Sequence, residues 1–386
     1  MSGTAWGSGL AAMSGAALQR AIGPSLPSGI ETPALVVDLD VVEANARRMQ
    51  AAMAAAGIAL RPHAKTHKSV ALARLQLDAG AHGITVGTLG EAEVMADGGI
   101  DDIFIAYPIW AVGEKAERLR ALHRRPGLRV AVGIDSAAGA ERLAAAVRHA
   151  GRPLEVLVEV DPRNRRTGVQ PKDAGALARA ARAVGLEVAG IFTHGGHAYG
   201  GPDRVAPAAS DEVAALADAL TGLRAEGIEP RVISAGSTPT ARAAATAPVN
   251  EMRPGTYLFG DRIELALGGC PADGVAIAIA ATVVSTATPG QVVIDAGAKT
   301  LTKDLPAYLQ GYGELADYPG TVIERVHDYH GVVGVPDGVR APTLGEVVRV
   351  IPNHACPVVD LQDRFVATRS GAFIGWMTVD ARGRSG

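Results

Sequence analysis

The sequence predicts an α/β fold, a (β/α)8 barrel of the TIM type with a C-terminal β domain. From residue 34 to about 260, short runs of β-branched residues alternate with alanine-rich helical stretches, which is the pattern of a parallel barrel. After about Gly269, amphipathic helical patterns give way to strand-like runs separated by turns. An open doubly wound sheet is the alternative, although the sequence has no dinucleotide-type glycine fingerprint after the first strand.

The expected barrel strands are short and apolar, and a helical stretch follows each of them. They are Ala34–Asp38, Ile58–Arg61, Gly83–Val86, Asp102–Ala106, Leu128–Ile134, Leu154–Asp161, Leu186–Thr193 and Arg231–Ala235, with Asn250–Arg253 as a further short candidate. The first helix is expected to begin after Asp40, which would form a capping box with Glu43. Its apolar positions Val42, Met49 and Met53 repeat at helical spacing.

The chain is expected to divide into a flexible leader at 1–30, a barrel at 31–269 and a β domain at 270–386. The leader is rich in Gly, Ala and Ser, and its apolar stretch is broken by Ser14 and Gly15, which argues against a secretory signal. Strand-like runs occupy the β domain. They are Val275–Thr286, Gln291–Asp295, Val322–His327, Glu346–Ile351 and Phe365–Val379.

Composition and charge are those of a globular protein. Of 386 residues, 48% are hydrophobic and 20% charged, and the net charge is −3 without long basic runs, so a nucleic-acid partner is not expected. No run approaches the roughly 18 apolar residues of a membrane span. Two cysteines rule out a disulfide framework and favour a reducing, cytoplasmic setting.

Polar segments follow four of the expected strands. In a barrel, catalytic groups gather at the carboxyl ends of the strands, so these segments should converge on one mouth. Lys65 lies between two histidines; by itself it would be read as a surface lysine, but a desolvated amine there could form an imine. The four segments are His63–His67, Arg163–Gly168, His194–Tyr199 and Gly236–Thr238, the last of which suits either an ordinary turn or a phosphate site.

A candidate metal site lies in the β domain at His354-Ala355-Cys356. The surrounding run Val347–Val359 reads as a strand interrupted by Pro352, and on a strand residues two apart face the same side. An imidazole and a thiolate that point together suit zinc, with water or substrate completing the coordination shell. The alternative is a half-buried histidine beside a buried cysteine without a metal.

Six segments together resemble the D-threonine aldolase and D-serine dehydratase family, which belongs to the alanine-racemase-like, fold-type III pyridoxal-phosphate enzymes. The segments occur in the family's order and span residues 32–380. They are Arg61–His67, Glu159–Gly168, His194–Tyr199, Ser234–Thr240, Glu251–Tyr257 and Pro352–Pro357.

The resemblance implies an N-terminal barrel, a C-terminal β domain and a homodimer whose active site uses both subunits. It implies that pyridoxal 5'-phosphate forms a Schiff base with Lys65, with His63 beside the cofactor. Arg166 is then expected near the ring hydroxyl and Tyr199 near the pyridine nitrogen. The residues expected at the phosphate are Gly236, Ser237, Thr238 and Tyr257.

The resemblance also implies a divalent metal on His354 and Cys356, zinc in dehydratase-like members and often manganese or another ion, such as magnesium, in aldolase-like ones. The expected substrates are D-configured β-hydroxy amino acids. If His194 or His197 takes the β-hydroxyl proton, glycine and an aldehyde form; if Lys65 takes the α-proton, a 2-oxo acid and ammonia follow. The aldolase is the first expectation and the dehydratase its alternative.

Three other functions are alternatives to this lyase. A racemase of the alanine type would need a second acid or base in the β domain, for which Tyr329 is a candidate. A non-catalytic cofactor carrier would lack the β domain and the His-Ala-Cys segment. A cofactor-free metallo-barrel is the third alternative, and an ultraviolet-visible spectrum of the protein would distinguish it from the others. Tyr329 and Asp360 depart from the family pattern, which usually has an acidic residue and an amide there.

Overall fold

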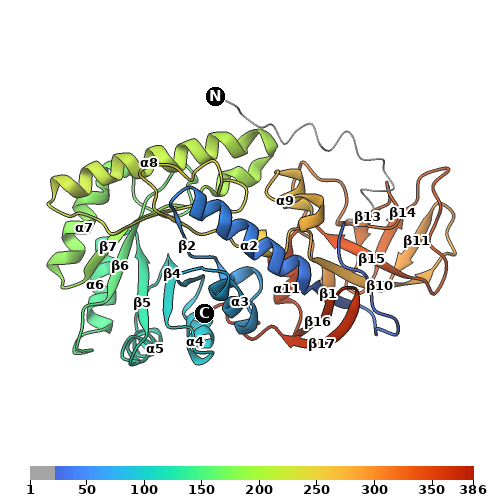
Figure 1. Cartoon of the computed structure of the whole chain (residues 1–386), viewed down its shortest axis with the longest axis horizontal. Helices are drawn as coiled ribbons and strands as arrows, with labels where there is room; N and C mark the ends of the chain where they lie inside the picture. The colour runs from blue at the N-terminus through green and yellow to red at the C-terminus, as the bar shows by residue number, and fades with distance from the viewer. Residues whose placement is uncertain (1–21) are drawn as a thin grey trace. The chain divides into compact units, whose positions relative to one another are not determined.

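The computed structural model describes residues 22–386. These residues form two compact units, coloured along the chain in Figure 1. The barrel unit comprises Glu43–Leu258, Ala266–Gly269 and Thr378–Gly386. The β unit comprises the described part of Met1–Val42, with Phe259–Leu265 and Cys270–Met377. The segment Thr378–Gly386 therefore belongs to the barrel unit, whereas the sequence pattern placed it in the β domain.

The barrel unit contains a parallel sheet of eight strands within the described residues, in the order β2-β9-β8-β7-β6-β5-β4-β3. A parallel bridge between His63 and Thr85, with a 2.8 Å hydrogen bond from the Thr85 N–H to the Pro62 carbonyl, connects the two ends of the sheet. The TIM-type barrel is therefore confirmed. Its strands are β2 Ala59–Leu60, β3 Ile84–Val86, β4 Asp102–Pro108, β5 Arg129–Ile134, β6 Glu155–Glu159, β7 Glu187–Phe192, β8 Val232–Ala235 and β9 Glu251–Met252.

The first expected barrel strand, Ala34–Asp38, does not belong to the barrel. β1 (Ala34–Asp38) pairs antiparallel with β10 (Ile277–Ser285) and parallel with β16 (Arg364–Arg369), both in the β unit. Val36 and Val37 are fully buried. An apolar run buried on both faces suits either sheet, so the pattern alone could not assign it. The eighth barrel strand is instead β9, which pairs with both β2 and β8.

Helices cover the outside of the parallel sheet, as the ribbon in Figure 1 shows for α5 to α8. The buried face of α2 contains Val42, Met49 and Met53, as expected. Asp38, not Asp40, caps α2: its Oδ1 accepts from the N–H of Asp40 at 2.9 Å. The helices are α2 Leu39–Ala55, α3 Val70–Asp78, α4 Leu89–Asp97, α5 Glu114–His123, α6 Ala137–Ala146, α7 Ala174–Ala183 and α8 Val205–Ala225.

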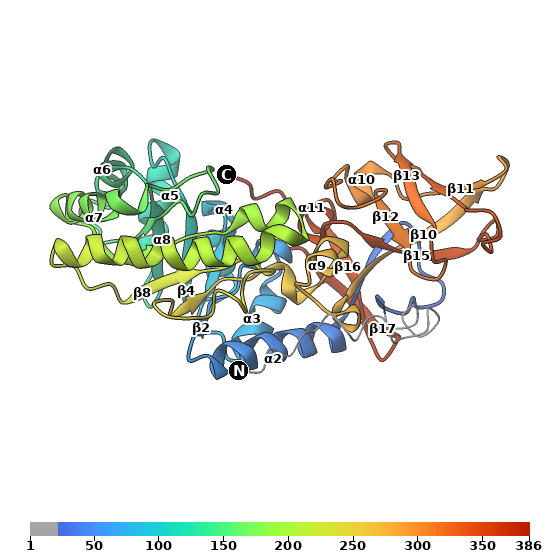
Figure 2. The ribbon, with the colours of Figure 1, turned by 90° about the horizontal axis from the view of Figure 1, so that it is seen from above.

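The β unit is built on antiparallel strands, labelled in Figure 2. Its sheet has the order β11-β14-β13-β12-β15-β10-β1-β16-β17, and a further pairing of β11 with β10 closes the first six strands into a ring. The expected run Phe365–Val379 is a hairpin that turns at Ser370 and Gly371, both at positive φ. The remaining strands are β11 Gln291–Ile294, β12 Gly313–Leu315, β13 Val322–Val326, β14 Gly331–Gly334, β15 Val347–Pro352 and β17 Ala372–Thr378.

Short helices join these strands, and one of them corrects the expected strand Val347–Val359. β15 ends at Pro352, and Ala355–Asp360 forms α11 with His354 as its N-cap residue. Pro357 lies in the first turn of α11, where a proline needs no hydrogen-bond donor. The same-face argument for His354 and Cys356 was therefore wrong. The other short helices are α9 Arg262–Ala266 and α10 Ala298–Leu301.

The expected flexible leader lies mostly outside the described residues, which begin at residue 22. Its last part, residues 22–30, packs on the β unit: Leu26 and Ile30 contact the apolar cluster that contains Val36. Arg349 Nη1 also donates to the carbonyls of Ile22 and Gly23, both at 3.2 Å. Residues 22–30 are therefore held by specific contacts, and the leader prediction is wrong for them.

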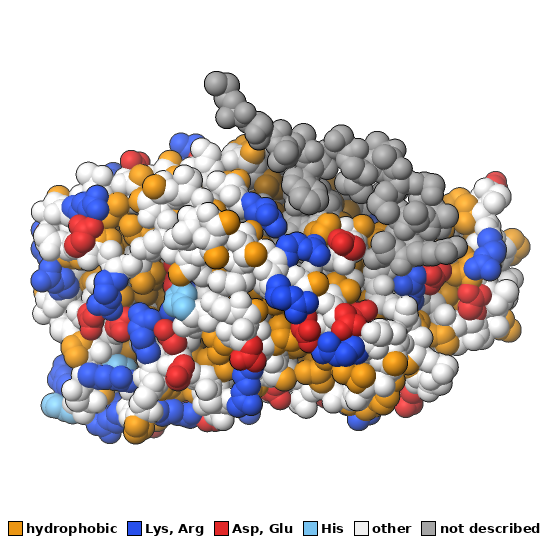
Figure 3. Space-filling model, in the orientation of Figure 1, with side chains coloured by type: hydrophobic (Ala, Val, Ile, Leu, Met, Phe, Trp, Pro, Cys, Tyr) orange, Lys and Arg blue, Asp and Glu red, His pale blue; other side chains and the backbone are white. Residues whose placement is uncertain are grey.

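Of the helices in the described residues, none combines the length and the apolarity that a membrane span requires. Figure 3 shows acidic and basic side chains intermixed on the face in view, where the described residues form no large basic patch.

Candidate active site

A pocket opens among the segments that follow the barrel strands. The lining residues come from the carboxyl ends of strands β2, β4, β6, β7, β8 and β9 or from the loops just beyond them, so the expected convergence is observed. The lining residues are His63, Lys65, Ala106, Tyr107, Arg166, Phe192, His194, Tyr199, Gly236, Ser237, Thr238, Arg253, Gly255 and Thr256.

Lys65 lies in the single 3-10 turn Ala64–Thr66 that follows β2. His63 caps this turn, because its Nδ1 accepts from the backbone N–H of Lys65 at 3.3 Å. The Lys65 amine is 3.4 Å from the hydroxyl of Tyr107, at the end of β4. The amine thus lies inside the pocket, between residues that follow β2 and β4.

Tyr107 also contacts Arg166, whose guanidinium carbon lies 5.0 Å from the centre of the Tyr107 ring. Burial raises the pKa of the Tyr107 phenol, but the charges of Lys65 and Arg166 outweigh burial, so the pKa is lowered overall. The hydroxyl is therefore a better proton donor than that of an ordinary tyrosine. The three side chains form one charged cluster.

Two histidines in the pocket are neutral at neutral pH. Burial, aided by the charges of Lys65 and Arg253, holds the pKa of His63 well below its usual value of 6.5. Burial and the charges of Lys65 and Arg166 do the same to His194. A neutral imidazole can accept a proton at one nitrogen, so His194 is available as a base, whereas His63 already uses its Nδ1 to accept from the Lys65 N–H.

Hydrogen bonds to neighbouring residues fix the turn Gly236–Thr238, which follows β8. The Gly236 N–H donates to Glu212 Oε1 at 2.9 Å, and the Ser237 N–H donates to Thr240 Oγ1 at 3.1 Å. Thr238 Oγ1 accepts from the Tyr257 N–H at 3.0 Å. The backbone N–H groups of Gly236 and Ser237 are therefore engaged within the protein, and the turn has a defined conformation before any anion binds.

Two residues expected at the site do not line it. His197 Nε2 is 3.3 Å from the Asp211 carboxylate, and its ring is not among the lining residues. The Tyr257 hydroxyl accepts from Gln76 Nε2 at 2.9 Å, and burial raises the pKa of that hydroxyl. Tyr257 reaches the turn only through its backbone. Of the two candidate histidine bases, the geometry therefore favours His194.

Sequence reasoning missed Tyr107 and Arg253 as pocket residues. Tyr107 is the first residue after the expected strand Asp102–Ala106, so the strand-end rule could have found it. Arg253 lies in the resembling segment Glu251–Tyr257 but was given no role. Its guanidinium carbon lies 5.8 Å and 5.1 Å from the ring centres of Phe104 and Phe192, and it donates to the Ser234 hydroxyl and the Thr193 carbonyl. No motif predicts such a buried arginine.

The donor set of the pocket fits a phosphate-bearing aldehyde. It offers an amine, a guanidinium, a hydroxyl-rich turn and two neutral imidazoles. Gly255 lets the loop after β9 approach the lysine segment, since a Cβ there would lie 2.8 Å from Thr66 Oγ1 and 3.1 Å from the His63 carbonyl. Arg166, one of the lining residues, has a side chain that is 40% exposed.

His354 and Cys356 lie together in the β unit. Burial lowers the pKa of His354, but Cys356 and Asp304 outweigh it and raise that pKa to about 11. The Asp304 carboxylate is 2.6 Å from His354 Nδ1, and the Asp261 carboxylate accepts from the N–H of Ala355 at 2.8 Å. Asp304 and Asp261 thus anchor the ring and the backbone of the segment.

This donor set fits a zinc-like ion, because an imidazole and a thiolate are its usual ligands. With Nδ1 engaged by Asp304, the ring is oriented to offer Nε2. Among the described residues, no group of three or more His, Cys, Asp and Glu side chains is arranged to hold a metal ion. His354 and Cys356 would thus form a two-ligand site that leaves coordination positions for solvent or substrate.

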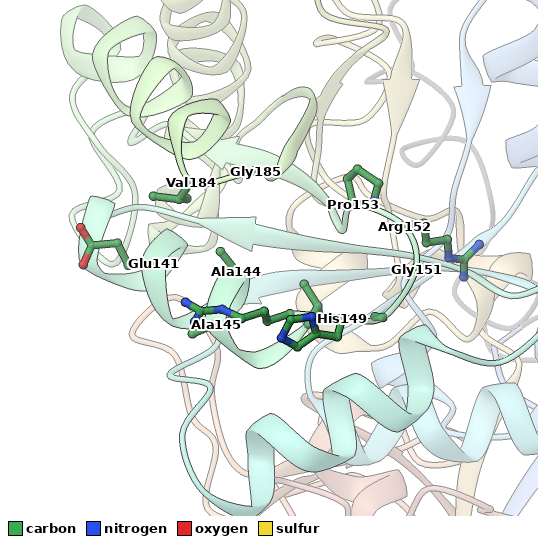
Figure 4. Close-up of a pocket in the computed structure, with 12 residues that line it drawn as sticks. Glu141, Ala144, Ala145, His149, Gly151, Arg152, Pro153, Val184 and Gly185 are labelled. Carbon is green, nitrogen blue, oxygen red and sulfur yellow. The ribbon is translucent and has the colours of Figure 1, made fainter.

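A larger cavity lies away from this chemistry. It has a volume of about 590 Å³ and is formed by the end of α6 and the loops that precede β6 and β7. Figure 4 shows Glu141, His149 and Arg152 among its lining residues. These loops are at the amino ends of the strands, opposite the mouth of a barrel. Arg152 is already engaged by the carbonyl of His123 at 2.9 Å.

Two family models match the chain. The model described as the alanine racemase N-terminal domain matches residues 37–263, and the model described as a putative serine dehydratase domain matches residues 276–368. A D-threo-3-hydroxyaspartate dehydratase of Delftia sp. strain HT23 is 38% identical, covering 85% of this chain and 91% of its own. A D-threonine aldolase of an Arthrobacter species is 35% identical, covering 92% of this chain and 94% of its own.

Solved structures of variants of the D-threo-3-hydroxyaspartate dehydratase match as well. A histidine-to-alanine variant has a TM-score of 0.84, with 34% identity over 91% of this chain and 95% of that chain. A cysteine-to-alanine variant, described as metal-free, has a TM-score of 0.83, with 34% identity over 91% of this chain and 98% of that chain. The two substituted positions are two residues apart, the same spacing as that of His354 and Cys356.

Proposed function

The chain belongs to the alanine-racemase-like family of pyridoxal-phosphate enzymes that carry a serine dehydratase domain, and on this premise we propose that it is a metal-dependent lyase of D-3-hydroxy amino acids. The observation that carries the proposal is the amine of Lys65, held among Tyr107, His63 and Arg166 where the barrel strands end. The relatives named above include an aldolase and a dehydratase, and both are lyases.

Pyridoxal phosphate would supply an electron sink for the bonds at the substrate's α-carbon. Lys65 would hold the cofactor's aldehyde carbon, and Ser237 and Thr238 would hold its phosphate. Arg166 would neutralise negative charge at the ring. The Lys65 amine lies 3.4 Å from the Tyr107 hydroxyl, so a proton that the free amine accepts could be exchanged with that oxygen.

A divalent metal on His354 and Cys356 would supply Lewis-acid chemistry toward the substrate's β-hydroxyl. Asp304 keeps the His354 ring oriented. For carbon–carbon cleavage, a neutral ring such as that of His194 accepts the β-hydroxyl proton. For dehydration, Lys65 would accept the α-proton, and the β-hydroxyl would leave as water once it receives a proton from the Lys65 ammonium or the Tyr107 hydroxyl. The enamine product would tautomerise to an imine, whose hydrolysis gives a 2-oxo acid and ammonia.

We favour dehydration over the aldol cleavage that the sequence placed first. The support is the His-Ala-Cys segment, whose histidine and cysteine have the spacing of the two positions varied in the dehydratase structures. A thiolate ligand selects zinc, a metal suited to stabilising a departing hydroxide. Aldol cleavage is the second candidate, favoured by the neutral His194 in the pocket.

Product analysis tests the proposal. Purified enzyme with cofactor and zinc is incubated with D-threonine, D-serine and D-3-hydroxyaspartate, and 2-oxo acid, ammonia, glycine and aldehyde are measured. Equal amounts of 2-oxo acid and ammonia are expected. Glycine with an aldehyde would select aldol cleavage, and the absence of all four products, with the cofactor bound, would contradict the lyase.

The proposal includes a homodimer. β17 is an edge strand, and its side chains Phe373, Ile374 and Trp376 are 51%, 51% and 44% exposed. Large apolar side chains on an exposed strand edge are typical of a protein interface. Light scattering is expected to give twice the chain mass, and a Trp376→Lys variant is expected to shift toward the monomer.

A further inference from the structure

A buried glutamate that the proposed reaction does not use lies behind the pocket. Glu212 belongs to α8, and its side chain is fully buried. Its Oε1 atom accepts from the N–H of Gly195 at 2.7 Å and from the N–H of Gly236 at 2.9 Å. Gly195 follows His194 after β7, and Gly236 begins the turn after β8. One carboxylate oxygen therefore connects the two loops that line neighbouring parts of the pocket.

The loop after β7 is shaped to accept this carboxylate. A Cβ at Gly195 would lie 2.7 Å from the carboxyl carbon of Glu212 and 2.9 Å from its Oε2. Gly236 has a φ of +104°, a conformation that L side chains rarely adopt, and a Cβ there would overlap the sulfur of Met252 at 2.1 Å. Both backbone positions are thus restricted to glycine, and both donate to the same oxygen.

Thr240 extends the network to the next residue of the turn. Its side chain forms a hydrogen bond with Glu212. Its Oγ1 accepts from the Ser237 N–H at 3.1 Å and lies 3.0 Å from the Ser237 hydroxyl oxygen. The N–H groups of Gly236 and Ser237 are therefore both fixed by side chains behind the turn. The conformation of the turn depends on Glu212 directly at Gly236 and through Thr240 at Ser237.

Glu212 acts on the conformation of the turn, because its Oε1 is engaged by the N–H groups of Gly195 and Gly236. Burial raises the pKa of Glu212 against the hydrogen bonds from Thr240, Gly236 and Gly195. Its Oε2 makes no hydrogen bond within the described residues. A buried carboxyl group with an unsatisfied oxygen is costly to keep, so its contribution must come from the contacts of the other oxygen.

We propose that Glu212 is a positioning residue that sets the turn Gly236–Thr238 for the cofactor's phosphate. This inference rests on the proposed function. It gives Glu212 a part in recognising the cofactor's phosphate group and not in the reaction itself. The effect should be largest on the phosphate, because Glu212 bonds directly and through Thr240 to the turn, whereas it reaches the loop His194–Tyr199 only at the backbone N–H of Gly195.

The test compares two ligands on one protein. Dissociation constants of pyridoxal phosphate and of pyridoxal, which has the aldehyde but lacks the phosphate, are measured by absorbance titration of the cofactor-free enzyme and its variants. Glu212→Ala should weaken pyridoxal phosphate about 10-fold to 100-fold, as expected for lost hydrogen bonds to a charged group, and pyridoxal less than about 2-fold. Glu212→Gln, whose amide oxygen can accept both N–H groups, should bind the phosphate ester nearly as the wild type does. Asp218→Ala, an exposed change on the same helix, is the control.

Equal weakening of both ligands in Glu212→Ala, or unchanged binding of both, would overturn the inference. If that variant does not fold, Gly195→Ala supplies the same comparison, because the added methyl group displaces the carboxylate; a phosphate-specific loss supports the inference and an equal loss contradicts it. A wild-type chain that binds neither aldehyde would contradict the proposed function itself, which separates the two failures.

Discussion

Burial has a larger effect than neighbouring charges on the pKa values of the two pocket histidines. His63 and His194 stay neutral because both rings are buried and lie near the charges of Lys65 and Arg253, with Arg166 adding to the effect at His194. In the β unit, Asp304 controls the orientation of one ring by a single contact. These effects act through specific atoms, so single substitutions can test them.

The first residue-scale prediction concerns pH. His194 acts as a base only when its ring is neutral, and its lowered pKa means that protonation begins well below pH ~6.5. For aldol cleavage, kcat/KM should therefore keep its plateau as pH falls through 6.5 and decline only at lower pH. A pH–rate profile of wild type and His194→Asn checks this. Half-loss of kcat/KM near pH 6.5 that is absent in the variant would contradict it.

The second concerns the metal. Asp304→Asn removes the carboxylate that orients His354, so zinc affinity should fall about 10-fold to 100-fold, as is usual when a carboxylate partner of a histidine ligand is lost. Competition titration with a chromophoric chelator measures it. Asp337→Asn, at an exposed position in the same unit, is the matched control. Unchanged zinc affinity in Asp304→Asn would contradict an orienting role for Asp304.

At the scale of elements, the sequence predicted well what local patterning controls. The βα alternation and the strand-end rule placed Lys65, Arg166, His194 and Gly236 at one mouth, where the structure brings them together. The rule could not assign β1, because a strand buried on both faces carries no mark of its sheet. It also could not anticipate α11, which begins at Ala355 and has Pro357 in its first turn. Roles that depend on side-chain direction, as for Tyr257, lie beyond patterning.

An element-scale prediction follows from the start of α2. Asp38 Oδ1 accepts from the N–H groups of Asp40 at 2.9 Å and Val41 at 3.4 Å, which otherwise would lack partners in the first turn. Asp38→Ala should lower the free energy of unfolding by about 1 kcal/mol. Urea denaturation measures it, with Asp38→Asn as the conservative variant that should retain most of the stability. An Asp38→Ala variant as stable as wild type would mean that Asp38 is not the cap.

At the scale of the whole barrel unit, a chain of ion pairs links the amino ends of the strands. Arg61 contacts Glu251 at 2.8 Å and Asp102 at 2.7 Å, and Asp102 contacts Arg129 at 2.9 Å. Arg129 and Arg231 continue the chain through Glu155 at 2.6 Å and 3.0 Å. Ion pairs thus lie at the amino-terminal end of the barrel, whereas the pocket lies at the carboxyl-terminal end.

Arg61 is the most buried member, with its side chain 3% exposed. Arg61→Met would leave Glu251 buried without its main counter-charge, so the free energy of unfolding should fall by about 3 to 5 kcal/mol. Arg224→Met, which breaks the exposed pair with Glu229, should change the melting temperature little. Calorimetry of both variants checks the contrast, and equal small effects would contradict a structural role for the chain of ion pairs.

The central claim is that Lys65 carries the cofactor, and reductive trapping tests it most directly. Purified enzyme with pyridoxal phosphate is treated with borohydride, digested and mapped by mass spectrometry, with Lys65→Ala as the control. The phosphopyridoxyl mass is expected on the peptide that contains Lys65 and nowhere in the variant. Stoichiometric label on another lysine, or none on an enzyme that binds the cofactor, would contradict the account.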